Sequence, residues 1–426
     1  MHRVVLICLL LFCIGCQTSG SAKHSVTKIS AANDGKSLVT AEFQKALDDA
    51  AKAGGGEIVV PPGNYLIGSI VMGSNTTLRL EKGATLTGSP NKEDYPLMTV
   101  RWEGRWRDGH RALIHAKDAK NIAIVGEGTI NGDMRIGELR NPRGPSIFEP
   151  IECQGVKIDG IRINFRRMWT IHLTYCSDVI ARNLTIRSVR DNGDGIDVDS
   201  TKDVLIENCD INTGDDAIAL KSGRGMEAVR IARPTENVTI KNCKLGSAFA
   251  GLAFGTEMSG GIRNVKFSDC TFTRGSNGIF IKSRVGRGGF MENITGENLK
   301  VEGARAFLRF DLVSRGIQDS EPVQGDDAYP RVGNIKLSNI TGTCDVLVEG
   351  NSINPERPVD GLTIVNTNVT AKRGIKLSNV KNAVLRDIKV EGAEGDLIST
   401  TNVTGPDGKP VGTPAPASAP TTVPGR

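Results

Sequence analysis

The sequence predicts an all-β fold, a single right-handed parallel β-helix, and two observations carry this prediction. Short phrases that alternate apolar and polar residues, such as NIAIVGEGTI at Asn121 and DVLIENCDIN at Asp203, recur at intervals of about 21 to 41 residues. The chain also has 50 glycines and only 4% aromatic residues, which is typical of a turn-rich β protein. Leucine-rich repeats would need an LxxLxL frame, and propeller blades would repeat evenly at about 40 residues. We therefore expect one β-helix domain over residues 37–403.

The first twenty residues have the pattern of an export signal. Arg3 precedes an apolar run, residues 4–14, that is too short to span a bilayer, and Cys16 follows it. This pattern predicts either a lipoprotein signal, in which Cys16 becomes lipidated, or an ordinary secretory signal cleaved near Ser21. Both alternatives place the protein outside the cytoplasm, as a secreted protein or a periplasmic or outer-membrane lipoprotein of a bacterium. A lipid on Cys16 is the only membrane contact that the sequence suggests.

The two ends of the predicted domain differ in composition from the repeats. Helical periodicity over residues 40–53, with Phe43 and Leu47 on one face, predicts a short helix that caps the apolar end of the coil stack. Residues 404–426 are rich in Pro, Ala and Thr and have few large apolar side chains, so we expect a disordered tail.

Cysteines and charge narrow the classes of function. Cys209, Cys243 and Cys270 occupy the same position in three successive repeats, which predicts a buried column of small side chains. An oxidising compartment would also permit a disulfide. Outside the export signal no CxxC or HxxxH spacing occurs, so we predict no metal site and no cofactor. The net charge of +5 is spread along the chain, which argues against nucleic-acid binding, and nothing indicates more than a monomer.

Two acidic segments one repeat apart, GDGIDVD and GDDAIAL, are the strongest candidates for chemistry. Each segment leads into a strand, and alternation points Ile196, Val198, Ile218 and Leu220 inward and leaves the residues between them, such as Asp197, facing solvent. Gly and Asp are also common turn residues, so one such segment alone would indicate a turn. Two equivalent segments favour a functional site.

Stacking of these two strands would bring together the carboxyl groups of Asp194, Asp215 and Asp216. Like charges held this close cannot all ionise freely, so the pKa of at least one carboxyl should be raised. A protonated carboxyl beside an ionised one supplies the acid and the base that glycoside hydrolysis requires.

A row of outward side chains follows in the segment NGIFIKSRVGRGG. Strand alternation places Phe280, Lys282 and Arg284 on one outer line, and Phe249 precedes the neighbouring strand. Two cations and an aromatic ring suit a sugar that carries a carboxylate, because the cations can hold the acid group while Phe280 packs against the ring. The alternative for the cations is that they are ordinary solvated surface residues.

These segments, together with PPGNYLIGSIVMGSNTTLRLEKGATLTGS, RWEG, WTIHLTYCSDV, DNGDGIDVDS and GTEMSGG, resemble glycoside hydrolase family 28 over most of residues 37–331. This family comprises the polygalacturonases and other pectin-degrading enzymes, and the resemblance implies a pectin-lyase-like β-helix that hydrolyses its substrate with inversion. Asn192 and Asp194 match the family's Asn-x-Asp motif, and Asp215 and Asp216 match its Asp-Asp motif. The resemblance implies that Asp215 is the general acid.

By the same resemblance, Asp194 and Asp216 position and deprotonate the attacking water, and Asn192 belongs to the substrate-binding residues. His172, in the phrase WTIH, would line the substrate cleft, with a purely structural histidine as the alternative. Lys282 matches the lysine of the family's Arg-Ile-Lys motif and would bind substrate.

The sequence departs from the family at two motif positions. Phe249 stands where the family has a histidine, and Phe280 stands where it has the arginine that helps to hold a galacturonate carboxylate. These changes favour rhamnogalacturonan or a decorated galacturonan, with a neutral sugar at one subsite, over plain homogalacturonan. Arg284 would then contact an acid group in a neighbouring subsite.

Two other classes of function stay open. A non-catalytic polysaccharide-binding β-helix is the first alternative, although three crowded carboxylates would repel an acidic polymer. A polysaccharide lyase is the second, since an outer row of Asp197, Asp199 and Asp215 could hold a cation, but Ca²⁺ needs six or more oxygens and no dedicated loop supplies them.

Overall fold

The computed structural model describes residues 25–137, 139–164, 168–189, 191–314 and 319–414. The predicted export signal, Cys16 and residues 415–426 of the predicted tail lie outside these ranges. Within the ranges, no helix is both long enough and apolar enough to span a membrane.

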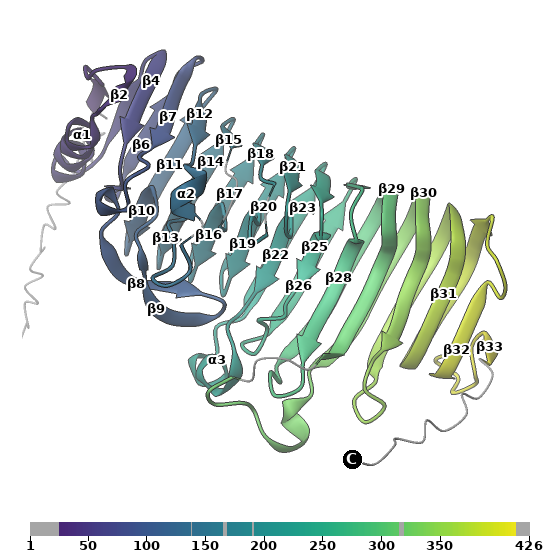
Figure 1. The fold of residues 1–426 in the computed structure, drawn as a ribbon. Coiled ribbons are helices and arrows are strands. Elements are labelled where there is room, and N and C mark those ends of the chain that lie inside the picture. Colours follow the sequence, from purple (N-terminus) through teal and green to yellow (C-terminus); the bar gives the residue numbers. More distant parts are fainter. Residues whose placement is uncertain (1–24, 138, 165–167, 190, 315–318, 415–426) are drawn as a thin grey trace, which may run out of the picture.

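The chain forms a parallel β-helix, as predicted, in which one continuous sheet of 31 strands winds through three faces (Figure 1). Each strand pairs in parallel with the equivalent strand of the coil before and the coil after it. The crossovers are right-handed, as parallel crossovers almost always are. The faces are named here as face 1, which carries the candidate acids, face 2 and face 3.

Face 1 consists of β5 (Ile70–Val71), β10 (Ile114–Lys117), β13 (Phe148–Ile151), β16 (Ile171–Thr174), β19 (Ile196–Asp199), β22 (Ile218–Lys221), β25 (Ala250–Phe254) and β28 (Asn277–Arg284). Face 2 consists of β1 (Ser25–Lys28), β3 (Gly56–Val60), β6 (Thr76–Leu80), β11 (Lys120–Gly126), β14 (Gln154–Asp159), β17 (Ser177–Arg182), β20 (Lys202–Glu207), β23 (Thr235–Lys241) and β26 (Ile262–Ser268). Face 3 consists of β2 (Asp34–Leu38), β4 (Gly63–Ile67), β7 (Ala84–Gly88), β12 (Thr129–Asn131), β15 (Arg162–Asn164), β18 (Thr185–Arg187), β21 (Asp210–Thr213), β24 (Lys244–Ser247) and β27 (Thr271–Thr273).

Three long strands continue the coils through more than one face before two short strands end them. They are β29 (Phe290–Ser314), β30 (Arg331–Ser352), β31 (Val359–Glu391), β32 (Ile398–Val403) and β33 (Thr413–Pro414). Outside the coils lie an antiparallel hairpin, β8 (Leu97–Trp102) and β9 (Arg105–His110), the helices α1 (Thr40–Lys52), α2 (Met134–Gly137) and α3 (Gly225–Ile231), and the 3₁₀ turns η1 (Lys92–Asp94) and η2 (Gly325–Ala328).

The hydrophobic core fills the interior of the coils from Ile29 to Val403. The predicted inward residues Ile196, Val198 and Ile218 have no exposed surface, which confirms the alternation inferred for β19 and β22. Helix α1 buries Phe43 and Leu47 against the first coil, which confirms the predicted cap (Figure 1).

The β-helix extends beyond residues 37–403 at both ends. β1 and β2 precede the cap and pair with β3 and β4, so the coils begin before residue 37. At the other end, the prediction of a disordered tail is wrong for residues 404–414, because β33 pairs with β32 and the Thr400 hydroxyl donates to the Val411 carbonyl at 2.6 Å. This segment gives the unpaired edge of the last coil a partner, which is why it is ordered despite its composition.

The residue that begins each repeat phrase lies at a tight turn with a left-handed backbone. Asn237, Asn264 and Asn293 have φ values of 57°, 57° and 58°, a region that asparagine and glycine tolerate best. Each of these side-chain amides donates to the residue above it in the previous coil, at 2.9 to 3.2 Å, and the acceptor is the Asp203 carboxylate for Asn237 and an asparagine amide oxygen for the other two. The repeat visible in the sequence is therefore a column of turns, and this column sets the register that aligns the functional residues of face 1.

The six described cysteines are all buried and none forms a disulfide. Cys209, Cys243 and Cys270 directly precede strands that pair in register, which confirms the predicted column.

Candidate active site

Three carboxyl groups converge where two neighbouring strands of face 1 begin. Asp194 lies just before β19, and Asp215 and Asp216 lie just before β22, which pairs with β19. One carboxylate oxygen from each of the three lies within 4.8 Å of the others. The predicted juxtaposition is confirmed.

The Asp215 carboxyl is held in place by backbone donors. The N–H of Asn192 donates to Oδ2 at 3.1 Å, and the N–H of Asp216 donates to Oδ1 at 3.0 Å. The hydroxyl groups of Thr213 and Ser247 both donate to the Asp215 carbonyl. Asn192 therefore contacts the site through its backbone, at a left-handed turn with φ 58°.

Asp194 and Asp216 are deeply buried, and each is only 3% exposed. Burial, and then repulsion by Asp197, raises the pKa of Asp194 well above its usual range. Burial raises the pKa of Asp216 to about 6, although the ammonium group of Lys282, 2.9 Å away, acts in the opposite direction. The predicted rise in the pKa of at least one carboxyl occurs at both residues, but its largest cause is burial and repulsion between the carboxylates is a smaller one.

A buried lysine that sequence reasoning missed stands behind these acids. The Nζ atom of Lys221 lies 2.8 Å from Asp197 Oδ1, 3.4 Å from Asp194 Oδ2, 3.7 Å from Glu257 Oε1 and 3.4 Å from the centroid of the Trp169 ring. Burial opposes its charge, but the three carboxylates together raise the pKa of Lys221 well above its ordinary value. Lys221 is therefore a cation that lowers the cost of keeping negative charge near Asp194. Strand alternation in β22 could have signalled its outward position.

The prediction that the outer residues of β19 face solvent is wrong. Asp197 and Asp199 have no exposed surface, because Lys221 covers the former and Arg101, from β8, covers the latter at 2.7 Å. Both carboxylates already have cationic partners. Asp197 and Asp199 therefore cannot serve in the outer row that was considered as the cation site of a lyase.

His172 does not line an open cleft, which corrects the resemblance-based expectation. Its ring has no exposed surface and lies between Glu149, 3.0 Å from Nδ1, and Asp199, 3.7 Å from Nε2. Burial opposes the charge, but hydrogen bonds to Asp199 and Glu149 raise the pKa of His172. The histidine is part of a buried ionic network, the structural alternative considered above.

The two phenylalanines that replace the family's histidine and arginine pack against each other. Their ring centroids lie 5.6 Å apart, and the Lys282 ammonium lies 4.5 Å from the Phe249 centroid and 5.4 Å from the Phe280 centroid. Phe280 points outward as predicted, but it is only 5% exposed because it packs against Ala219 and Ala253. Phe249, 37% exposed, presents most of the accessible aromatic surface instead.

Arg284 does not continue the line from Phe280 to Lys282. A bulge falls between Lys282 and Arg284, where the register with β29 shifts. The next coil supplies a different cation at the edge of the aromatic pair, since the Arg309 guanidinium lies 5.0 Å from the Phe280 centroid. Register pairing of β28 with β29 places Arg309 there, which the sequence alone did not indicate.

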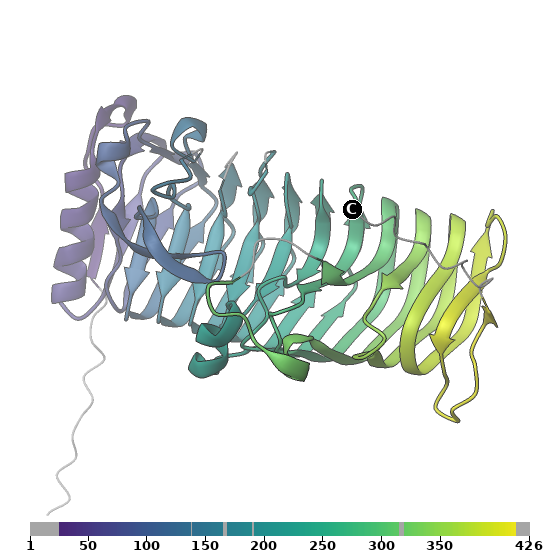
Figure 2. The same ribbon diagram turned by 60° about the horizontal axis from the view of Figure 1, so that its bottom comes forward.

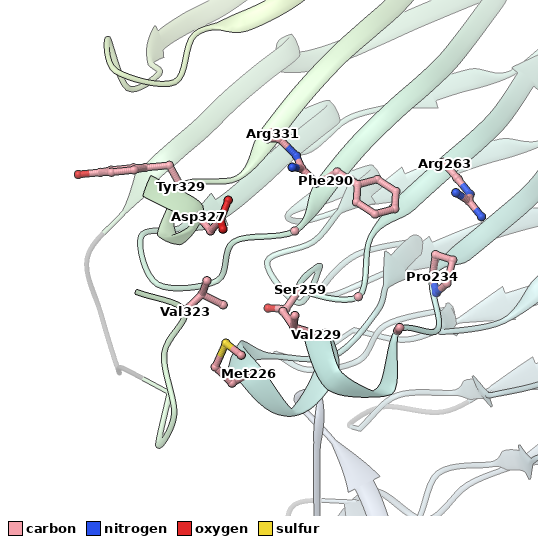
Figure 3. Close-up of a pocket in the computed structure, with 13 residues that line it drawn as sticks. Met226, Val229, Pro234, Ser259, Arg263, Phe290, Val323, Asp327, Tyr329 and Arg331 are labelled. Carbon is pink, nitrogen blue, oxygen red and sulfur yellow. The ribbon is translucent and has the colours of Figure 1, made fainter. Parts of the chain in front are cut away.

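The pocket shown in Figure 3 lies away from the three carboxylates, next to α3 and the segment that leads into β30. It has a volume of about 440 Å³, and among the described residues that line it Asp327 alone carries a carboxyl group. Glycoside hydrolysis uses a pair of carboxyl groups, so the carboxyl cluster on face 1 is the better candidate.

The cluster on face 1 therefore has the components of acid and base catalysis. Two buried carboxyls have raised pKa values, a third is fixed by backbone donors, and two lysines balance part of the charge. A protonated and an ionised carboxyl can coexist here near neutral pH.

Comparison with known proteins agrees with this geometry. The family model for "Glycosyl hydrolases family 28" matches residues 52–394. A probable polygalacturonase of Vitis vinifera is 31% identical over 289 residues, which cover 63% of this chain and 59% of the relative. An exo-poly-alpha-D-galacturonosidase of Dickeya chrysanthemi is 25% identical over 328 residues, which cover 64% and 54%. The chain thus spans less than two thirds of the length of these curated relatives.

Among solved structures, a hyperthermoactive exopolygalacturonase from Thermotoga maritima superposes with a TM-score of 0.75 at 27% identity, over 85% of this chain and 91% of that one. A family 28 exopolygalacturonase of Yersinia enterocolitica, at 20% identity and a TM-score of 0.77, shares the fold.

Proposed function

Because this chain belongs to glycosyl hydrolases family 28, we propose that it hydrolyses glycosidic bonds in galacturonate-containing polysaccharides of the pectin type. The observation that supports this function most directly is the convergence of Asp194, Asp215 and Asp216 within 4.8 Å. Such crowding is costly for a binding protein, whereas a hydrolase needs it to keep an acid and a base in one site.

Each carboxyl has a distinct role in the proposed reaction. Asp215 protonates the oxygen of the leaving sugar, and its two backbone donors fix the direction of its carboxyl. Asp194 and Asp216 hold the attacking water and accept its proton, and a pKa of about 6 gives Asp216 the base strength that neutral or mildly acidic conditions require. Asp215 gives one proton to the leaving sugar, and the base accepts one proton from the attacking water. Exchange of these protons with solvent then restores the starting protonation of the site.

We also propose inversion at the anomeric carbon. The oxygens lie closer together than the roughly 6.5–9.5 Å that separates the carboxyl groups of most inverting enzymes, and this spacing taken alone favours retention. A retaining nucleophile, however, has to reach the anomeric carbon and bond to the sugar directly, whereas a base acts through the water that it holds. Asp194 and Asp216 are almost fully buried with raised pKa values, which suits groups that hold and deprotonate a water.

The aromatic pair supports a subsite for a neutral or decorated sugar. Phe249 offers an exposed ring face next to Lys282, and the Lys282 ammonium is already engaged by Asp216. A ring face without a free cation binds the apolar side of a sugar better than a carboxylate. We therefore propose rhamnogalacturonan or a substituted galacturonan as the preferred polymer. Such polymers lie outside cells, and the export pattern in residues 1–20, with or without a lipid on Cys16, supports action there.

The purified protein should release reducing ends from one or more of homogalacturonan, rhamnogalacturonan and xylogalacturonan, without the ultraviolet absorbance of an unsaturated uronate. Proton NMR of the first product should show the inverted anomer before mutarotation. Unsaturated products would identify a lyase. Binding to a polymer without any release of reducing ends would identify a binding protein, and the retained anomer would contradict the role proposed for Asp194 and Asp216.

Removal of the Lys282 charge should change the pH dependence of the enzyme. Lys282 lowers the pKa of Asp216, so in Lys282→Met this pKa should rise above 6. If Asp216 has to be ionised, the acid limb of kcat/KM should lie near pH 6 in the wild type and should move to higher pH by about one unit or more in Lys282→Met.

The matched variant Lys282→Arg keeps a cation beside Asp216 and should keep the limb near its wild-type position. Lys300→Met, at an exposed ion pair with Glu302, should leave the profile unchanged. An acid limb that stays in place in Lys282→Met would mean that Asp216 does not control it.

A further inference from the structure

Face 1 is covered on the side of the carboxyl cluster that leads to α1. Its outer ladder there consists of His115, Glu149, His172 and Asp197, which pair in register from β10 to β19. All four side chains are polar or charged, yet their exposed fractions are 4%, 0%, 0% and 0%. Polar outer residues become this inaccessible only when another part of the chain lies over them.

The cover is the β8–β9 hairpin together with residues 139–146. Arg101 of β8 donates to Asp199 at 2.7 Å, and Arg143 donates to Glu149 at 2.6 Å. Both arginines are fully buried, so the hairpin and the loop pack directly on the outer surface of the sheet. Figure 2 shows the hairpin lying across the strands near the α1 end of the β-helix.

The hairpin is fastened at its tip as well as along its length. Arg105 lies 3.0 Å from Asp319, which Arg224 and Arg287 also approach, at 2.6 and 2.9 Å. Asp319 comes from the segment before η2 and Arg224 directly precedes α3, so three separate segments hold the tip in place. A cover that is anchored both along its length and at its tip is a fixed wall rather than a loop that moves aside for a polymer.

The opposite side of the cluster is open along the same ladder. Beyond Phe280, the ladder continues through Arg309, Glu349 and Lys376. The side chains of Arg309 and Glu349 are 32% and 28% exposed, and Lys376 is exposed. Long charged side chains that reach solvent here leave room for a polysaccharide to extend over these coils.

The wall stands close to the reacting carboxyls. His172 and Asp197 are on adjacent coils, and Asp194 belongs to the same coil as Asp197. Adjacent coils are about 4.8 Å apart, so only one or two coil spacings separate the covered ladder from the cluster. A sugar ring is itself about this size, and a chain cannot continue through buried Arg101 and Arg143.

We propose that this enzyme acts on the ends of polysaccharide chains, with the terminal one or two sugars held between the β8–β9 wall and the carboxyl cluster. The remainder of the polymer extends over the open coils that carry Arg309 and Lys376. This proposal rests on the proposed function, because it specifies which part of the polymer the same site accepts.

The test uses the full-length wild-type protein and the polymer among the three that supports the highest rate. Release of reducing ends is followed together with viscosity, and products are separated by size from the first minutes. A mono- or disaccharide should be the sole early product, and viscosity should fall slowly. A ladder of product sizes with a rapid loss of viscosity would overturn the chain-end proposal and leave the hydrolase function standing.

The same reaction on oligosaccharides labelled at the reducing end identifies which end meets the wall. If the label stays on a chain that is shortened by a constant unit, the non-reducing end lies at the wall. If the label is released on a short fragment, the reducing end lies at the wall. Either pattern supports the proposal, whereas labels spread over many lengths contradict it. No cleavage of any substrate would remove the proposed function itself, and the chain-end proposal with it.

Discussion

Asp215→Asn should lower kcat on the preferred polymer by about 10²–10⁴-fold, the usual contribution of a positioned general acid. The asparagine side chain has the same shape, so the carboxyl's place beside Asn192 and Asp216 stays filled. It has no proton acidic enough to give to the leaving sugar. KM and binding to the polymer should change far less than kcat, because the substitution removes an interaction that matters in the transition state.

A matched control is available one strand away. Asp210 lies in β21 and forms an exposed ion pair with Arg187, at 2.7 Å, so Asp210→Asn makes the same chemical change outside the site. Its kcat should equal that of the wild type, since exposed pairs contribute about 0–1 kcal/mol to stability. If Asp215→Asn kept more than a tenth of wild-type kcat, a group other than Asp215 would have to supply the proton.

Lys221→Met should cause the largest loss of stability among the changes considered, about 3–5 kcal/mol near neutral pH. The substitution leaves Asp197, Asp194 and Glu257 buried without their shared cation. Methionine fills a similar volume, so the loss would come from uncompensated charge rather than from a cavity. Urea unfolding monitored by circular dichroism measures the free energy of unfolding of both proteins.

This loss should depend on pH in a defined direction. The pKa values of Asp194, Asp197 and Glu257 are raised in the folded protein, mainly by burial, and loss of Lys221 raises them further. A carboxyl whose pKa is raised in the folded protein favours folding only while it is protonated. Its contribution to stability is therefore complete below the pKa that it has in the unfolded state, and is lost as pH rises through the pKa that it has in the folded state. The difference between variant and wild type should therefore be larger at pH 7.5 than at pH 5.

Two further variants separate this effect from an ordinary loss of a lysine. Lys241→Met removes a half-exposed pair with Glu207, at 3.0 Å, and should change the unfolding free energy by less than about 1 kcal/mol. In the double variant Lys221→Met/Asp197→Asn, one of the orphaned charges is also removed, so part of the lost stability should return. Equal stability of Lys221→Met and wild type at pH 7.5 would show that the buried lysine does not compensate the acids.

The sequence by itself determined the β-helix and the carboxyl cluster. Repeat phrases that begin at residues such as Asn237 and Asn264 mark equivalent turns, and coils that stack in register bring equivalent positions together. Two acidic segments one repeat apart, which contain Asp194 and Asp216, therefore had to meet on neighbouring strands. Local alternation and a repeat interval are properties of the chain alone, and they suffice for this prediction.

Only the tertiary structure decided what covers the outer surface of face 1. Arg101 and Asp199 are 98 residues apart, and no local pattern predicts that a hairpin inserted between coils folds back over β19. This cover buried Asp199 and His172, and the packing of Phe280 on Ala219 and Ala253 transferred the exposed aromatic surface to Phe249. Strand alternation tells which side chains point out of the coil, whereas exposure depends on insertions whose positions are set by packing and ion pairs between distant segments.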